Sequence, residues 1–319
     1  MLEKLKKGSP AAVTFAAIIA CLIWGMPFKL LKVFYNELHI SPETFGHAYN
    51  GQMLLAVSLR FFLSGCMTLL FARATKNRIF SLKRTQWLHV AIMGLVSTTI
   101  SYYFFNIGNV NITSSVNASL LGQSGIFFGV MLSPLFFKEE RITVWKLLAL
   151  LLGFCGLFIS QLKPGVSVGE SFASVSLHGE GFMLIHGIIF AIATMLGKHY
   201  TTDLNPFVMT GWNLVIGSVG LGLLGMYMGG RLSALTFTPK AVFLLLVLAA
   251  ASAIPFSVWY WCTKFMEVGR LSIFKFLVPV SGSIIAVLFG ETFTPILGIG
   301  LVMVCASIVL INLNFQKEG

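Results

Sequence analysis

The chain has 319 residues, of which 56% are hydrophobic and only 10% are charged, and its mean hydropathy is +0.87. This composition excludes a single water-soluble globular domain, which carries far more polar sequence. The net charge of +11 does not indicate nucleic-acid binding, because the Lys and Arg residues are scattered over short segments and form no basic domain. The expected surrounding is therefore the lipid bilayer.

Apolar windows long enough to cross a membrane follow one another along the chain. A helix needs about 20 residues to span the hydrocarbon core, and helices are expected because lipid offers backbone groups no hydrogen-bond partner. The windows are 11–34, 51–72, 87–108, 115–137, 143–162, 179–199, 207–229, 240–262, 271–290 and 293–314. The sequence predicts an all-α polytopic membrane protein with ten transmembrane helices. The first window lacks a following A-x-A-like cleavage site and is interpreted as a retained span.

Basic residues fall mostly on one side of these spans. If the N-terminus is cytoplasmic, the outer side carries Lys163, Arg231 and Lys240, the last at the first residue of a span. The other basic residues face the cytoplasm, except Lys29, Lys32, Arg60 and Lys275 inside the spans. Cytoplasmic loops are the ones that carry an excess of Lys and Arg. We therefore expect both termini and the segment 73–84 in the cytoplasm, and the segment 35–50 outside.

The chain divides into two similar halves. The stretch 161–178 is rich in Gly, Ser and Pro and separates five predicted spans from five. We interpret 1–162 as a first five-helix repeat, 163–178 as a linker and 179–319 as a second repeat, with Glu140 and Glu291 at matching positions. Because five is odd, the second repeat enters the membrane with opposite orientation. Secondary transporters use such inverted repeats for alternating access.

Several motifs carry a family resemblance. They are LIWGMPFKLLK closing the first predicted span, LRFFLSG in the second, TSSVNASLL opening the fourth with KEE at its end, and KFLVPVSGSIIAVLFGE in the ninth. In this order, and over nearly the whole chain, they resemble the EamA family of the drug/metabolite transporter superfamily. Two features depart from its pattern: GQSGIFFG stands where the fourth span usually has a proline, and the connection 35–50 is long.

The resemblance implies a multi-pass carrier of the cytoplasmic (inner) membrane, commonly an exporter of amino acids or other small metabolites. It also implies a central cavity lined by the first, third, fourth, sixth, eighth and ninth spans. Its partners would be a small-molecule solute and the lipid bilayer.

Basic side chains inside the spans are the first candidates for solute binding, because ionisable groups are costly in lipid. Arg60 lies deep in the second span and either faces the cavity or bonds to carbonyls and neighbouring helices. Lys275 lies near the start of the ninth span and either binds an anionic group of the solute or extends to the interface. Lys29 and Lys32 are expected to extend to the interface. No carboxylate lies well inside a span, so an anionic or zwitterionic solute is favoured.

Aromatic, amide and hydroxyl residues complete the candidate binding set, since small-molecule pockets combine apolar walls with a few polar groups. The candidates are Trp24, Tyr102, Tyr103, Asn106, Asn117, His186, Trp259, Tyr260 and, on the helix face of Lys275, Ser272. Gln123 belongs to the same inventory. As alternatives, the Tyr and Trp residues near span ends form an interfacial belt, and His186 is a packing residue rather than a proton relay.

Other chemistries find little support in the sequence. The five cysteines show no CxxC spacing and are interpreted as small apolar residues, with no metal site. Glu139, Glu140 and Glu291 at span ends are expected to cap helices or form ion pairs. The motifs GxxxxGK[ST], HExxH and GxSxG are absent, so neither ATP hydrolysis nor another enzymatic activity, and no cofactor, is expected.

The preferred function is a secondary transporter that exports amino acids or related small metabolites. An uptake carrier for another organic solute, a channel and a membrane-embedded enzyme are the alternatives. The sequence leaves open the solute, proton coupling and the choice between monomer and homodimer.

Overall fold

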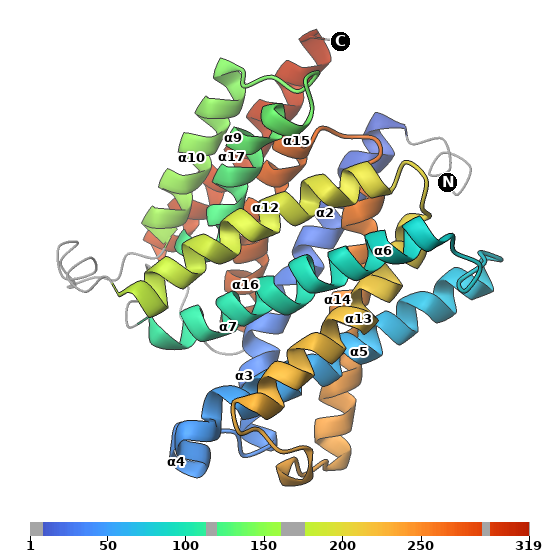
Figure 1. Cartoon of the computed structure of the whole chain (residues 1–319). Coiled ribbons are helices and arrows are strands. Elements are labelled where there is room, and N and C mark those ends of the chain that lie inside the picture. The colour runs from blue at the N-terminus through green and yellow to red at the C-terminus, as the bar shows by residue number, and fades with distance from the viewer. Residues whose placement is uncertain (1–8, 113–119, 161–175, 289–293, 319) are drawn as a thin grey trace. The chain divides into compact units, whose positions relative to one another are not determined.

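The computed structural model describes residues 9–112, 120–160, 176–288 and 294–318, and within these ranges the chain is helical and contains no strand (Figure 1). Eight helical segments are long and apolar enough to cross a bilayer: Pro10–Glu37, Pro42–Ala74, Arg84–Asn111, Leu177–Tyr200, Pro206–Tyr227, Pro239–Cys262, Val268–Ile285 and Pro295–Leu313. Two shorter apolar helices, Leu120–Phe136 and Val144–Ser160, correspond to the fourth and fifth predicted spans. The prediction of an all-α polytopic membrane protein is confirmed.

The helices form two compact units, and each unit combines segments from both halves of the sequence. Unit 1 consists of Met1–Gly25, Phe104–Met195 and Phe265–Gly319. Unit 2 consists of Met26–Tyr103 and Leu196–Lys264. Most of the predicted linker 163–178 lies outside the described residues, although Leu177 and His178 already belong to the next helix. The division into two inverted repeats stays a prediction.

The first predicted span is interrupted, which the continuous window 11–34 did not anticipate. Helix α2 (Pro10–Gly25) ends one residue before Met26, and α3 (Pro27–Glu37) follows. Pro27 has no N–H to donate to the carbonyl four residues earlier, so the regular hydrogen-bond ladder cannot continue. The division between the two units falls at this interruption.

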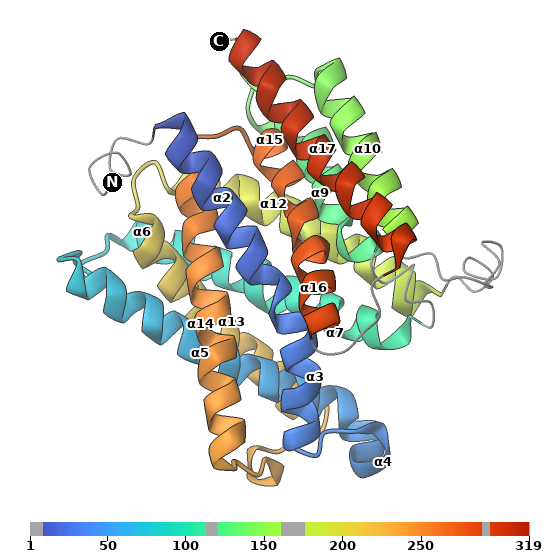
Figure 2. The ribbon, with the colours of Figure 1, turned by 180° about the vertical axis from the view of Figure 1, so that it is seen from behind.

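Unit 2 is built around the pair α5 (Tyr49–Ala74) and α13 (Pro206–Tyr227), which lie side by side in Figures 1 and 2. A Cβ atom on Gly65 would lie 2.8 Å from the Gly211 carbonyl oxygen, so the two backbones approach as closely as small residues permit. The other helices of the unit are α3, α4 (Pro42–Phe45), η1 (Gly46–Ala48), α6 (Arg84–Met93), η2 (Gly94–Ile100), the first residues of α7 (Ser101–Asn111), η4 (Leu232–Ala234) and α14 (Pro239–Cys262).

Unit 1 contains two helix pairs that Figure 2 displays clearly: α10 (Val144–Ser160) with α17 (Pro295–Glu318), and α2 with α16 (Leu277–Leu288). The start of α2 and the end of α17 lie toward the same end of this unit in both views. Its remaining elements are α9 (Ser124–Phe136), η3 (Leu177–Gly181), most of α12 (Phe182–Tyr200), α15 (Val268–Ile273) and η5 (Phe274–Phe276).

Each polar contact between loops of unit 2 joins two loops that the charge pattern assigns to the same side of the membrane. At one end, the Glu37 carboxylate accepts from Thr238 Oγ1 at 2.7 Å and pairs with Lys240 Nζ at 2.7 Å. At the other end, Asn205 Nδ2 donates to Asn77 Oδ1 at 3.0 Å, which ties the segment 73–84 to the start of α13. The alternation of loops between two sides therefore agrees with the sequence pattern inside this unit.

Glu140 holds the connection between α9 and α10 against the start of α15. Its carboxylate oxygens accept from the backbone N–H groups of Val268 at 2.9 Å and Gly269 at 3.2 Å, and the residue is buried. Beside it, Lys146 Nζ forms a 2.6 Å ion pair with Glu267. A carboxylate at a helix N-terminus satisfies free N–H groups and complements the helix dipole. This is a capping role, as expected from its place at a span end.

We expect Glu140→Ala to lower the free energy of unfolding by about 1.5–3 kcal/mol, because two buried N–H groups lose a charged acceptor. The neighbouring Glu139 is exposed, so Glu139→Ala is the matched control. Thermal unfolding of the purified variants in detergent measures the difference. Equal melting temperatures for the two variants would show that the contact of Glu140 with α15 contributes nothing to stability.

Candidate functional site

Lys275 lies in a short 3-10 turn that interrupts the ninth predicted span. The turn η5 separates α15 from α16, and Lys275 is its central residue. Pro279 lies four residues further on and has no N–H to donate to the Lys275 carbonyl, which explains why the regular helix does not form here. The proline thus sets the local backbone that carries the lysine.

Two aromatic rings of unit 1 surround the Lys275 ammonium. Its Nζ lies 3.5 Å from the ring centroid of Phe190 on α12 and 6.0 Å from that of Trp24 on α2. The two rings are themselves 6.3 Å apart at an interplanar angle of 69°. A cation over an aromatic face is attracted by the ring quadrupole, and more strongly when water is excluded. At 8% exposure the side chain is buried, which is not the position of a lysine that extends to the interface.

Three other predicted residues of unit 1 lie in described positions. His186 is buried one helical turn before Phe190, and its ring lies 4.9 Å from that of Phe105. Asn106 and Ser272 are also buried. Every residue from Val268 to Val278 is buried, so Ser272 and Lys275 lie in a segment that is enclosed on all sides.

Arg60 is the corresponding buried cation of unit 2. It lies on α5, is 5% exposed, and its guanidinium carbon is 4.4 Å from the ring centroid of Phe61. Within the described residues, Nε and Nη1 of Arg60 have no hydrogen-bond partner. The expected alternative, in which the side chain bonds to carbonyls, therefore does not hold for these two nitrogen atoms.

The other predicted positions of unit 2 are aromatic side chains. The rings of Phe61 and Tyr102 are 4.5 Å apart, and Phe256 lies 6.1 Å from Phe61. Trp259 and Tyr260 on α14 are completely enclosed, with 0% and 1% exposure. Their burial differs from that of an interfacial belt, in which rings lie at the headgroups. Tyr102 and Tyr103 are both half-buried.

Some predicted positions lie outside the described residues. They are Asn117, Glu291 and the side chain of Lys29. Lys32 is described and exposed, as expected for a lysine near the interface, and Gln123 is buried. No three His, Cys, Asp or Glu side chains gather as a metal site would require in the part of the chain that the structure describes.

Sequence reasoning missed the apolar partners of both cations and one polar cluster. Phe190 is one of 29 phenylalanines, and nothing in its local sequence distinguishes it. Phe61 follows Arg60 in the LRFFLSG motif, but its contact with the guanidinium was not predicted. In unit 2, Asn213 Oδ1 accepts from Ser97 Oγ at 2.8 Å and from Thr98 Oγ1 at 2.9 Å. The run of hydroxyl residues at 97–99 was a usable signal, because such side chains commonly join helices in membranes. This cluster fastens the π-helical segment η2 to α13.

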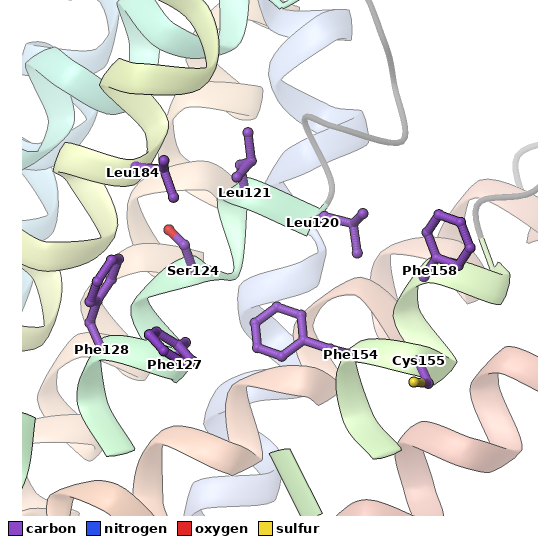
Figure 3. A pocket seen from close by; sticks show the side chains of 9 residues that line it. All are labelled: Leu120, Leu121, Ser124, Phe127, Phe128, Phe154, Cys155, Phe158 and Leu184. Atoms are coloured by element: carbon purple, nitrogen blue, oxygen red, sulfur yellow. The ribbon is translucent and has the colours of Figure 1, made fainter. Parts of the chain in front are cut away.

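An apolar pocket of about 500 Å³ lies among α9, α10 and α12 in unit 1 (Figure 3). Its lining residues are Leu120, Leu121, Ser124, Phe127, Phe128, Phe154, Cys155, Phe158 and Leu184. None of the predicted binding residues lines it. With one hydroxyl and one thiol among nine side chains, its chemistry suits a hydrocarbon group and not a charged solute.

The fold and these buried cations define a polytopic helical membrane protein with charged sites inside its spans. The sequence profile of the EamA-like transporter family matches residues 11–162 and 177–313. The chain belongs to this family, and the resemblance noted in its motifs is confirmed. It is therefore a member of a transporter family and not of an enzyme family.

Relatives and a solved structure agree with this assignment. The chain is 25% identical over 269 residues to an uncharacterised transporter of Archaeoglobus fulgidus, covering 84% of this chain and 86% of the relative. It is 24% identical over 312 residues to the transporter YoaV of Bacillus subtilis, covering 96% and 98%. A crystal structure superposes with a TM-score of 0.75 at 16% identity, covering 97% of this chain and 99% of the other. At that identity the superposition supports the fold alone.

Proposed function

We propose that this protein is a secondary carrier that exports amino acids or related small metabolites across the cytoplasmic membrane by alternating access. The observation that carries the proposal is the Lys275 site, in which a buried ammonium contacts the rings of Phe190 and Trp24. No ion pair or hydrogen bond joins its Nζ to another described residue. The anionic group of a solute would supply the missing charge, and the aromatic rings would pack against its apolar part.

The inverted-repeat arrangement inferred from the sequence supports the alternating-access part of the proposal. The residues proposed to bind the solute are Trp24, Asn106, His186, Ser272 and Lys275 in unit 1 and Arg60, Tyr102, Tyr103, Trp259 and Tyr260 in unit 2. Asn117, which lies outside the described residues, is proposed on the sequence alone. Proton coupling would employ His186 or a solute-dependent proton on Lys275. A monomer contains both proposed repeats, and a homodimer would place two such carriers side by side.

Reconstitution of the purified protein into liposomes tests the proposal. Labelled amino acids and other small organic acids are offered with and without an imposed proton gradient, and protein-free liposomes are the control. We expect saturable movement of at least one solute, with a stimulation by the gradient if protons are coupled. Non-saturable ion conductance would instead indicate a channel. Movement of no solute would contradict the proposal.

The proposed orientation predicts a specific labelling pattern in intact cells. In a background without native cysteines, a cysteine at His39 is expected to react with an impermeant thiol reagent, while one at Lys76 is expected to react only after permeabilisation. Both residues have a positive φ, 55° and 63°, so the two substitutions carry similar backbone strain. Labelling at Lys76 but not at His39 would reverse the orientation.

A further inference from the structure

The guanidinium of Arg60 is enclosed in unit 2 without an internal anion. The acidic residues of this unit are Glu37, Glu43 and Asp203. Glu37 is engaged by Lys240 and Thr238, and the other two are exposed. A buried charge that lacks a counter-charge is costly in protein and more so at membrane depth. A group from outside the chain is therefore the candidate partner.

The donors left free on Arg60 are arranged for a planar oxyanion. A guanidinium presents two edges that can grip a carboxylate: Nε with Nη2, and Nη1 with Nη2. Nε and Nη1 have no partner among the described residues, so each edge retains an unused donor. The guanidinium carbon lies 4.4 Å from the centroid of the Phe61 ring, so the cation contacts this ring while Nε and Nη1 remain without hydrogen bonds.

The surroundings of Arg60 favour an apolar body without an ammonium group. Three aromatic rings form a cluster here, those of Phe61, Tyr102 and Phe256. The distance between the centroids of any two of them is 6.2 Å or less. Such rings pack against aryl or branched alkyl groups. Since no buried carboxylate of the unit faces this position, an ammonium on the solute would meet only the positive charge of Arg60 and the rings.

We propose that Arg60, with the rings of Phe61, Tyr102 and Phe256, is a binding site for an aryl or alkyl carboxylate that lacks an ammonium group. This assignment rests on the proposed transport function and narrows its solute class from amino acids and related metabolites to monoanionic organic acids. Arg60 holds the carboxylate through paired N–H donors, and the aromatic side chains contact the apolar part.

Equilibrium binding to the purified protein in detergent tests the site with three ligands of matched body. They are 3-phenylpropionate, phenylalanine and phenethylamine, which differ in the presence of the carboxylate and the ammonium. We expect 3-phenylpropionate to bind most tightly and phenethylamine least. Arg60→Met is expected to weaken 3-phenylpropionate binding by about 10- to 100-fold, since a hydrogen-bonded charge pair is lost. Arg60→Lys is expected to retain part of the affinity because lysine keeps the charge but not the fork.

The exposed Arg231 of the same unit provides the control, and Arg231→Met is expected to bind as the parent protein does. The melting temperature of ligand-free Arg60→Met gives a second readout. A guanidinium without an internal partner can be replaced by an apolar side chain without loss of stability, so we expect an unchanged or higher value. A lower melting temperature together with unchanged 3-phenylpropionate affinity would assign Arg60 a structural role and overturn the proposal. Preference for phenylalanine over 3-phenylpropionate would overturn the solute class.

Transport by the same variants separates this inference from the proposed function. Saturable movement of a solute whose rate and affinity are the same in the parent protein and Arg60→Met would contradict the Arg60 site while leaving the carrier function intact. Absence of all transport, combined with binding that depends on Arg60, would contradict the carrier function and leave the site intact.

Discussion

Replacing Gly156 with leucine is expected to prevent stable packing of α10 against α17 and to leave little folded protein after extraction. A Cβ atom at Gly156 would lie 2.7 Å from the Gly300 carbonyl oxygen, and one at Gly300 would lie 2.5 Å from the Gly156 carbonyl oxygen. Both contacts are with backbone, which cannot rotate away as a side chain can. Insertion of extra atoms into a close-packed contact costs about 1–3 kcal/mol or more. Gly156→Ala, with a single methyl group, is expected to fall in this range.

Gly282→Ala is the matched control for Gly156→Ala. Gly282 lies inside helix α16, and the nearest atom to an added Cβ there is the Gly25 carbonyl oxygen at 3.6 Å, an ordinary van der Waals contact. Removal of a helix glycine then favours folding by up to about 1 kcal/mol. The melting temperatures of the two alanine variants in detergent are compared with that of the parent protein. If the melting temperature of Gly156→Ala is no lower than that of Gly282→Ala, the stability of the protein does not depend on the close approach of α10 and α17.

Replacing Lys275 with methionine is expected to weaken the transport of anionic and zwitterionic solutes strongly while leaving a folded, membrane-inserted protein. Methionine fills similar space between Phe190 and Trp24 but supplies no charge to the solute. Loss of a charged hydrogen bond corresponds to a fall of about 10- to 100-fold in apparent affinity. Lys275→Arg keeps the charge and is expected to retain part of the activity. Solute uptake into liposomes at varied concentration measures these changes.

Lys264 provides the comparison for Lys275, because it is exposed in the connection that precedes α15. Lys264→Met is expected to transport as the parent protein does. Phe190→Leu keeps the lysine but removes the aromatic face 3.5 Å from its Nζ, and an intermediate loss of affinity is expected. Unchanged apparent affinity in Lys275→Met would remove the main support for an anionic group on the solute.

The segments that act as spans could be read from the sequence because bilayer thickness imposes a length on every crossing. The seventh and eighth predicted spans, 207–229 and 240–262, differ from α13 and α14 by two residues or fewer at each end. Interruptions were harder to predict. Pro27 and Pro279 each removed a backbone donor inside an apolar window, so the first and ninth spans contain breaks that hydropathy alone does not register.

The sequence identified the two candidate cations by their charge, but it did not identify the side chains that surround them. Lys275 and Arg60 were recognisable because ionisable groups are rare inside spans. The aromatic partner Phe190 was not distinguishable, since many phenylalanines in the chain satisfy the same local pattern. Phe61 follows Arg60 in a quoted motif, but its contact with the guanidinium was not predicted. Glu140 was expected to cap a helix, but the helix that it caps begins at Val268, more than 100 residues later in the chain.

The sequence by itself determined the fold class, the number of apolar helices and the family, because each depends on local composition and on motif order along the chain. Only the tertiary structure decided that Arg60 lacks a hydrogen bond at Nε and Nη1, that the Lys275 ammonium lies over an aromatic ring, and that each unit combines both halves of the sequence. The physical reason is that side-chain partners in a helical membrane protein come from helices distant in sequence. Their choice depends on how small residues such as Gly156 and Gly300 let those helices approach.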